Sequence, residues 1–120
     1  MKLRIKGNSI RLRLLRGEVA QLLQKGFLSE ETQFSRLPAD NFYYGVILSD
    51  EADKVEAKFE RGRIMIVLPR TTAESWAAGD DLGIEARPNG LEILVEKDLV
   101  CHGRPGDPDN ADAFGAEARP

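Results

Sequence analysis

The sequence predicts an α+β fold: one domain over residues 1–97 with a mainly antiparallel, curled or barrel-like sheet of about eight strands and two short helices. Three observations predict this class. Short segments alternate apolar and polar residues with period two, which is typical of half-buried strands. Two other segments change to helical spacing, and each ends at a glycine. The order strand, strand, helix, strand, strand occurs twice, over residues 1–49 and 54–97, as a pattern with little residue identity.

Eight short segments have the residue pattern of strands. Most alternate apolar with charged residues, as Leu3 and Ile5 do between basic neighbours, and this indicates one buried and one exposed face. Residues 64–68 form a continuous apolar run, which is typical of a central strand covered on both faces. Asn89-Gly90 predicts a hairpin turn, because both residues tolerate positive φ. The expected strands are residues 2–6, 10–14, 27–34, 42–48, 55–60, 64–68, 83–86 and 91–95.

Two segments carry apolar residues at helical spacing. Residues 17–25 end at Gly26, although Gly17 at their start offers no side-chain acceptor for an N-cap. Residues 72–78 carry a second apolar stripe and end at Gly79. Short helices between strands fit a sheet that closes on itself or, as the alternative, an open sheet with both helices on one face.

The apolar faces of the strands are expected to meet in the core, because a chain of 120 residues needs its hydrophobic side chains there. We expect Trp76 to pack over them, and truncation of Ile66 to alanine to cost ~2–5 kcal/mol. The strand residues predicted to be buried are Ile5, Leu12, Leu14, Val46, Leu48, Phe59, Ile64, Ile66, Ile84, Ile93 and Val95.

The composition excludes several classes of protein. No apolar run approaches the ~20 residues that span a membrane, and residues 2–6 alternate charge with hydrophobe, unlike a signal peptide. We therefore expect a cytoplasmic protein without membrane contact. The single cysteine and single histidine, Cys101 and His102, are adjacent and leave little for a disulfide framework, a metal site or a catalytic triad. No catalytic residue, metal or cofactor is expected, and the protein is favoured to be a non-enzyme.

Basic residues are concentrated at the start of the chain. The first sixteen residues carry six basic residues and no acid, whereas the whole chain has a formal net charge of −3, which disfavours nucleic-acid binding. If the basic faces pointed into a closed sheet, they would line a polar tunnel able to hold a phosphorylated ligand. The opposite arrangement, with the apolar faces inward, is favoured. The candidate anion-binding residues are Lys2, Arg4, Lys6, Arg11 and Arg13.

The opening sequence KLRIKGNSIRLRL, residues 2–14, resembles a small family of bacterial proteins of unknown function. Residues 83–86 and 91–98, followed by Cys101 and residues 112–114, support the same resemblance. The family carries no known activity, so the resemblance implies no mechanism.

At the level of the fold, the pattern is also similar to the CYTH-like triphosphate tunnel enzymes. Those proteins have eight antiparallel strands, two helices from a duplicated unit, and a charged tunnel. Their first strand carries an E-x-E-x-K pattern that binds metal, whereas Lys2 and Arg4 stand here where the acids belong. The resemblance therefore implies anion binding and not the metal-dependent hydrolysis of that class.

Two functions remain after these exclusions. The favoured one is a non-enzymatic interaction or regulatory domain, with homo-oligomerisation left open and the partner unidentified. The alternative is a binder or processor of a small phosphorylated ligand in a CYTH-like tunnel. Residues 98–120 are expected to form a C-terminal tail, flexible or docked through Phe114, the large apolar side chain of its last nineteen residues.

Overall fold

The structure is a computed structural model that describes residues 1–99 and 111–114, and it confirms the α+β class. The elements follow the repeated order, and a short 3-10 helix precedes the last strand of each half. The strands are β1 (Lys2–Lys6), β2 (Ser9–Leu14), β3 (Phe27–Gln33), β4 (Asn41–Ser49), β5 (Glu56–Glu60), β6 (Arg63–Pro69), β7 (Gly83–Ala86) and β8 (Glu92–Lys97). The helices are α1 (Arg16–Lys25), α2 (Arg70–Ala78) and the 3-10 helices η1 (Pro38–Asp40) and η2 (Pro88–Gly90).

The described strands form two four-stranded sheets, which we call sheet A (order β1-β2-β8-β7) and sheet B (order β3-β4-β6-β5). Each sheet joins two antiparallel hairpins through one parallel pair, β2 with β8 in sheet A and β4 with β6 in sheet B. The strands are therefore mixed and the sheets do not close into a barrel. Closure fails because each half of the chain contributes one hairpin to each sheet, so both sheets keep two free edges.

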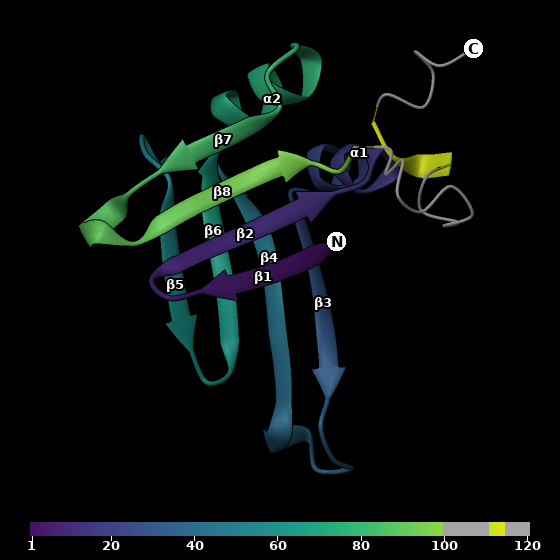
Figure 1. Cartoon of the computed structure of the whole chain (residues 1–120), viewed down its shortest axis with the longest axis vertical. Coiled ribbons are helices and arrows are strands. Elements are labelled where there is room, and N and C mark those ends of the chain that lie inside the picture. Colours follow the sequence, from purple (N-terminus) through teal and green to yellow (C-terminus); the bar gives the residue numbers. More distant parts are fainter. Residues whose placement is uncertain (100–110, 115–120) are drawn as a thin grey trace.

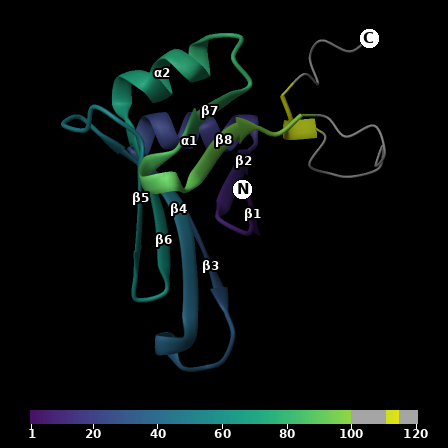
Figure 2. The ribbon, with the colours of Figure 1, turned by 60° about the vertical axis from the view of Figure 1, so that its left-hand side comes forward.

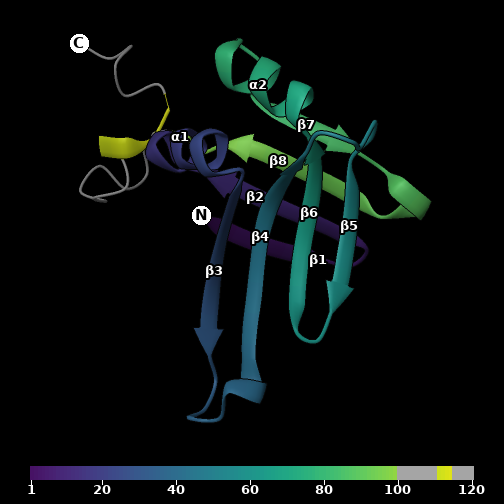
Figure 3. The same cartoon turned by 180° about the vertical axis from the view of Figure 1, so that it is seen from behind.

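The two sheets pack face to face as a sandwich. Figure 1 shows sheet A in front of sheet B, with the strands of the two sheets crossing steeply, and Figure 3 shows the same arrangement from behind. Both helices lie at one end of the sandwich (Figure 2), where α1 leads from sheet A to sheet B and α2 leads back. The buried apolar residues form one cluster between the sheets and beneath the helices.

The two halves of the chain occupy equivalent places in this sandwich. Leu12 on β2 and Ile66 on β6 are both fully buried, and each lies beside a valine of the parallel neighbouring strand. Ten residues further along, Leu22 on α1 and Trp76 on α2 are both buried as well. The repeat seen in the sequence is thus a repeat of core positions and not only of element order.

The helix starts differ from the expected ones, whereas the ends agree. α1 begins at Arg16 and α2 at Arg70, two residues before the expected start of the second helix. Gly26 follows α1 with a φ of 82°, a left-handed conformation that glycine adopts without strain, and its N–H donates to the carbonyl of Leu22. Gly79 follows α2 in extended conformation.

The predicted burial is confirmed for most of the core, including Trp76, but it is wrong for two residues. Ile5 is 54% exposed and Phe59 is 72% exposed. The two are equivalent in the repeat, because Ile5 pairs with Ile10 on β2 and Phe59 pairs with Ile64 on β6. Both lie on an edge strand of their sheet, close to the turn that joins it to the neighbouring inner strand. Alternation identified their face correctly, but it carries no information on which strands lie at the edge of a sheet.

The described part of the tail lies on the same subunit. Phe114 is half-buried against the core, and its N–H donates to the carbonyl of Asp98 at 2.7 Å. Asp112 accepts the N–H of Gly17 at 3.1 Å, so it supplies the acceptor that the first turn of α1 lacks in its own sequence. Within the described residues, Phe114 therefore contacts the domain, and the division of the chain at residue 97 stays a prediction. The cysteine and the histidine singled out in the sequence, Cys101 and His102, lie outside the described residues.

Candidate functional site

The five predicted anion-site residues lie together on the outer face of sheet A, which we call the charged face. The pairing of β1 with β2 sets Lys2 opposite Arg13 and Arg4 opposite Arg11. Alternate residues of a strand point to opposite faces, so these side chains point away from Leu12 and the rest of the core. The apolar faces turn inward, and the charged face is an open surface and not the lining of a tunnel.

Acidic residues neutralise the end of the charged face that lies nearest the tail. Because β8 runs beside β2, Glu96 lies next to Arg13, and its Oε1 is 2.7 Å from the Nε of Arg13 and 3.5 Å from the Nε of Arg11. Lys2 Nζ lies 3.1 Å from Asp98 Oδ2. Both acids are buried beneath these basic side chains. The three cations at this end therefore have a structural role in pairing buried carboxylates.

The other end of the charged face, towards the turn between β1 and β2, keeps an excess of positive charge. Arg4 and Lys6 are exposed, and neither forms an ion pair with any residue that the structure describes. Arg4 also lies directly opposite Arg11, and like charges at opposed strand positions repel each other. An acidic group placed here would relieve that repulsion.

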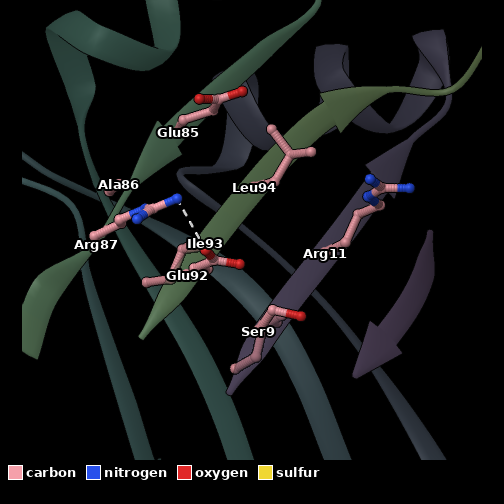
Figure 4. Close-up of a pocket in the computed structure, with 9 residues that line it drawn as sticks. Ser9, Arg11, Glu85, Ala86, Arg87, Glu92, Ile93 and Leu94 are labelled. Carbon is pink, nitrogen blue, oxygen red and sulfur yellow. Dashed lines mark ion pairs between the residues drawn. The ribbon is translucent and has the colours of Figure 1, made fainter. Parts of the chain in front are cut away.

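A groove of about 470 Å³ lies beside this end, over β2, β8 and β7. In Figure 4, Arg11 stands at one side of the groove, Leu94 lies in the middle, and Glu85 stands at the far side. Arg87 and Glu92 form an ion pair of 2.9 Å across its end. Two cations and two carboxylates give the groove a mixed charge, whereas phosphate recognition requires several converging donors without competing carboxylates.

A second polar cluster ties the start of the chain to sheet B. The amino group of Met1 contacts the carboxylates of Glu18 on α1 and Glu30 on β3, at 3.0 Å for Glu30. Tyr44 on β4 donates its hydroxyl proton to Glu30 Oε2 at 2.7 Å. One signal of this cluster is visible in the sequence, because Glu30 interrupts the alternation of its strand. No motif links the other three residues.

The electrostatics of this cluster indicate a structural role. Burial alone would raise the pKa of Glu30, but the Tyr44 hydroxyl and the Met1 ammonium outweigh it and hold that pKa below its usual range. Burial, followed by the neighbouring Glu30 carboxylate, raises the pKa of Tyr44 to about 12. Every charged group here is matched by an opposite charge or a hydrogen bond. The cluster therefore fastens elements together and presents no group poised for proton transfer.

Neither a metal site nor a membrane segment occurs in the part of the chain that the structure describes. Within residues 1–99 and 111–114, no three histidine, cysteine, aspartate or glutamate side chains come together as metal ligands would. Neither of the helices in these residues combines the length and the apolar character that crossing a membrane demands.

Comparison with known proteins gives one match. A family described as "Family of unknown function (DUF7009)" matches residues 1–117. The match spans both halves of the repeat and the charged face. No curated protein and no solved structure matches the chain, and nothing links it to the CYTH-like tunnel enzymes.

Proposed function

The chain belongs to this family of unknown function, and we propose from its structure that it is a non-enzymatic interaction domain whose charged face binds an acidic protein surface in the cytoplasm. The carrying observation is the excess positive charge of Arg4 and Lys6, which are exposed and have no ion pair within the described residues. A flat strand face with long cationic side chains suits a broad partner better than a small ligand.

Two other partners fit the charged face less well. Nucleic acids would meet the acidic residues of β8 and β7 beside the basic strands, and the chain as a whole is acidic. A small phosphorylated ligand, the alternative function, loses its expected tunnel because the sheets do not close. The groove that remains has a mixed charge.

The test uses poly-glutamate as the acidic probe and the full chain as the receptor. Binding is measured by fluorescence anisotropy for the wild type and for Arg4→Glu/Lys6→Glu, which reverses charge on exposed side chains and leaves the Glu96 pairs intact. The matched control is Lys54→Glu/Lys58→Glu, which makes the same change in net charge near β5. We expect a loss of about tenfold or more in the first variant only.

The alternative function has its own measurement. Thermal-shift assays with nucleotides and polyphosphate report any anion that binds the folded chain, because such binding raises its stability. Stabilisation that disappears in Arg4→Ala/Lys6→Ala, together with no binding of poly-glutamate, would overturn the interaction function in favour of a phosphorylated ligand. Binding of poly-glutamate that is equal in both charge-reversal variants would also overturn it.

A further inference from the structure

Strand β1 has a free edge. The order β1-β2-β8-β7 gives it one neighbour, β2, and leaves the backbone groups of its other side without a strand partner in the described residues. Four of its five residues are exposed. Free strand edges of this kind accept an extended segment as an additional strand, and main-chain hydrogen bonds then supply the contact.

The two faces of β1 would select different side chains in such a segment. On the charged face stand Lys2, Arg4 and Lys6, and on the opposite side stand Leu3 and the 54% exposed Ile5. Side chains on an added strand would lie ~4.5–5.5 Å from these residues in directly opposed positions. Acidic side chains would match the first row, and apolar side chains would match the second.

Sheet B offers further apolar surface beyond this edge. Its strands extend past β1 at the end away from the helices (Figures 1 and 2). On the core-facing side of that extension, the rings of Phe42 and Tyr44 are half-buried with centroids 6.2 Å apart, and Phe59 is 72% exposed. These aromatic side chains give the apolar residues of an added strand a surface to cover.

The same charges exclude self-association through this edge. Two copies of β1 paired together would align six cations on one face, and like charges in opposed positions are destabilising. Lysine on an edge strand is a known device against such pairing. One of the two outer strands of sheet B, β5, carries Glu56, Lys58 and Glu60, so its charged row has both signs.

We infer that β1 binds an extended segment of another protein in which acidic residues alternate with apolar ones, added as a fifth strand to sheet A. This inference rests on the proposed function, because it names the form in which the acidic partner meets the charged face. Charge alone would accept any acidic surface, whereas strand addition requires both the alternation and free main-chain groups.

The test compares three capped peptides of one composition in which glutamate and valine are alternating, segregated into blocks, or alternating with N-methyl groups on every second residue. Each is titrated into the full chain, and amide hydrogen exchange of β1 is followed by NMR. We expect the alternating peptide to bind at least about tenfold more tightly than the other two and to slow exchange at the free edge of β1. Arg4→Glu/Lys6→Glu should abolish this difference, and Lys54→Glu/Lys58→Glu should retain it.

The outcomes separate the two proposals. Equal binding of the three peptides, lost in Arg4→Glu/Lys6→Glu, overturns strand addition and leaves the acidic-surface function supported. Absence of binding by all peptides and by poly-glutamate overturns both. Concentration-dependent dimers in light scattering that vanish when Arg4 and Lys6 are reversed overturn the inference, because the edge would then pair with a second copy.

Discussion

Two equivalent positions of the repeat, Leu48 in the first half and Lys97 in the second, hold residues of opposite chemistry. Leu48 lies beside Leu68 on the parallel strand β6, and Lys97 lies beside Leu14 on the parallel strand β2. Both side chains are buried, with 7% and 9% exposure. The same framework therefore encloses a leucine in one half and a cation in the other.

The second half can bury Lys97 because other groups surround its charge. Nζ donates a hydrogen bond to the carbonyl of Gly79 at 2.9 Å, and it lies 5.9 Å from the ring centroid of Trp76 and 5.5 Å from that of Phe114. Aromatic faces stabilise a nearby cation, particularly where water is excluded. The first half needs no such cover, since a leucine has no polar group to satisfy. The tail residue Phe114 therefore covers the position where the second half has a lysine and the first half has a leucine.

The largest expected effect tests whether the two halves contribute equally to the core. Leu12→Ala and Ile66→Ala truncate equivalent, fully buried residues, so each should cost ~2–5 kcal/mol of unfolding free energy. Urea unfolding monitored by Trp76 fluorescence measures both. Ile47 lies on the outer face of sheet B and is 39% exposed, so Ile47→Ala serves as the control and should cost clearly less unfolding free energy. A loss below ~1 kcal/mol in either core variant would contradict the equivalence of the halves.

A smaller effect tests the link between Lys97 and the tail. Phe114→Ala should cost ~1–2 kcal/mol, because the half-buried ring also contributes a cation–π contact. In a Lys97→Leu background, which restores the chemistry of Leu48, that cost should fall by ~0.5–1 kcal/mol. A double-mutant cycle from chemical unfolding gives the coupling. Additive costs would show that Lys97 does not depend on Phe114.

The last effect, which appears only at high pH, concerns Tyr44, whose equivalent in the second half is the buried Ile93. The pKa of Tyr44 is raised to about 12, above the ~10 of an unfolded tyrosine. Its neutral phenol therefore stabilises the fold fully below pH ~10, and this contribution is lost as the pH rises through about 12. Tyrosinate absorbance in a Tyr43→Phe variant follows Tyr44 alone.

A second substitution identifies the cause of that shift. In the Tyr43→Phe background, Glu30→Gln should lower the pKa of Tyr44 part of the way towards ~10, because burial remains and the neighbouring carboxylate is gone. Tyr44→Ile, which makes the two halves alike, should remove the loss of stability between pH ~10 and ~12. An unchanged Tyr44 pKa in the glutamine variant would assign the shift to burial and Glu18 rather than to Glu30.

The candidate site was partly predictable from residue order. Alternation places the three basic residues of β1 on one face of that strand and the two of β2 on one face of theirs, because successive side chains of a strand point to opposite sides. The pairing of β1 with β2 then brings both sets to the same face of sheet A. Their division into paired and unpaired cations was not predictable. The hydrogen bond from Arg13 to Glu96 joins residues 83 positions apart and exists only because β2 and β8 are neighbours. Nothing near either residue specifies that pairing.

The sequence by itself determined the elements, their repeated order and the inward face of each strand, since period-two alternation, helical spacing and terminal glycines act within a few residues. The tertiary structure decided which hairpins meet. It divided the strands into two open sheets, left Ile5 and Phe59 exposed on edge strands, and enclosed Lys97 beneath Trp76 and Phe114. These outcomes depend on contacts between segments far apart in the chain, whose pairing no local pattern encodes.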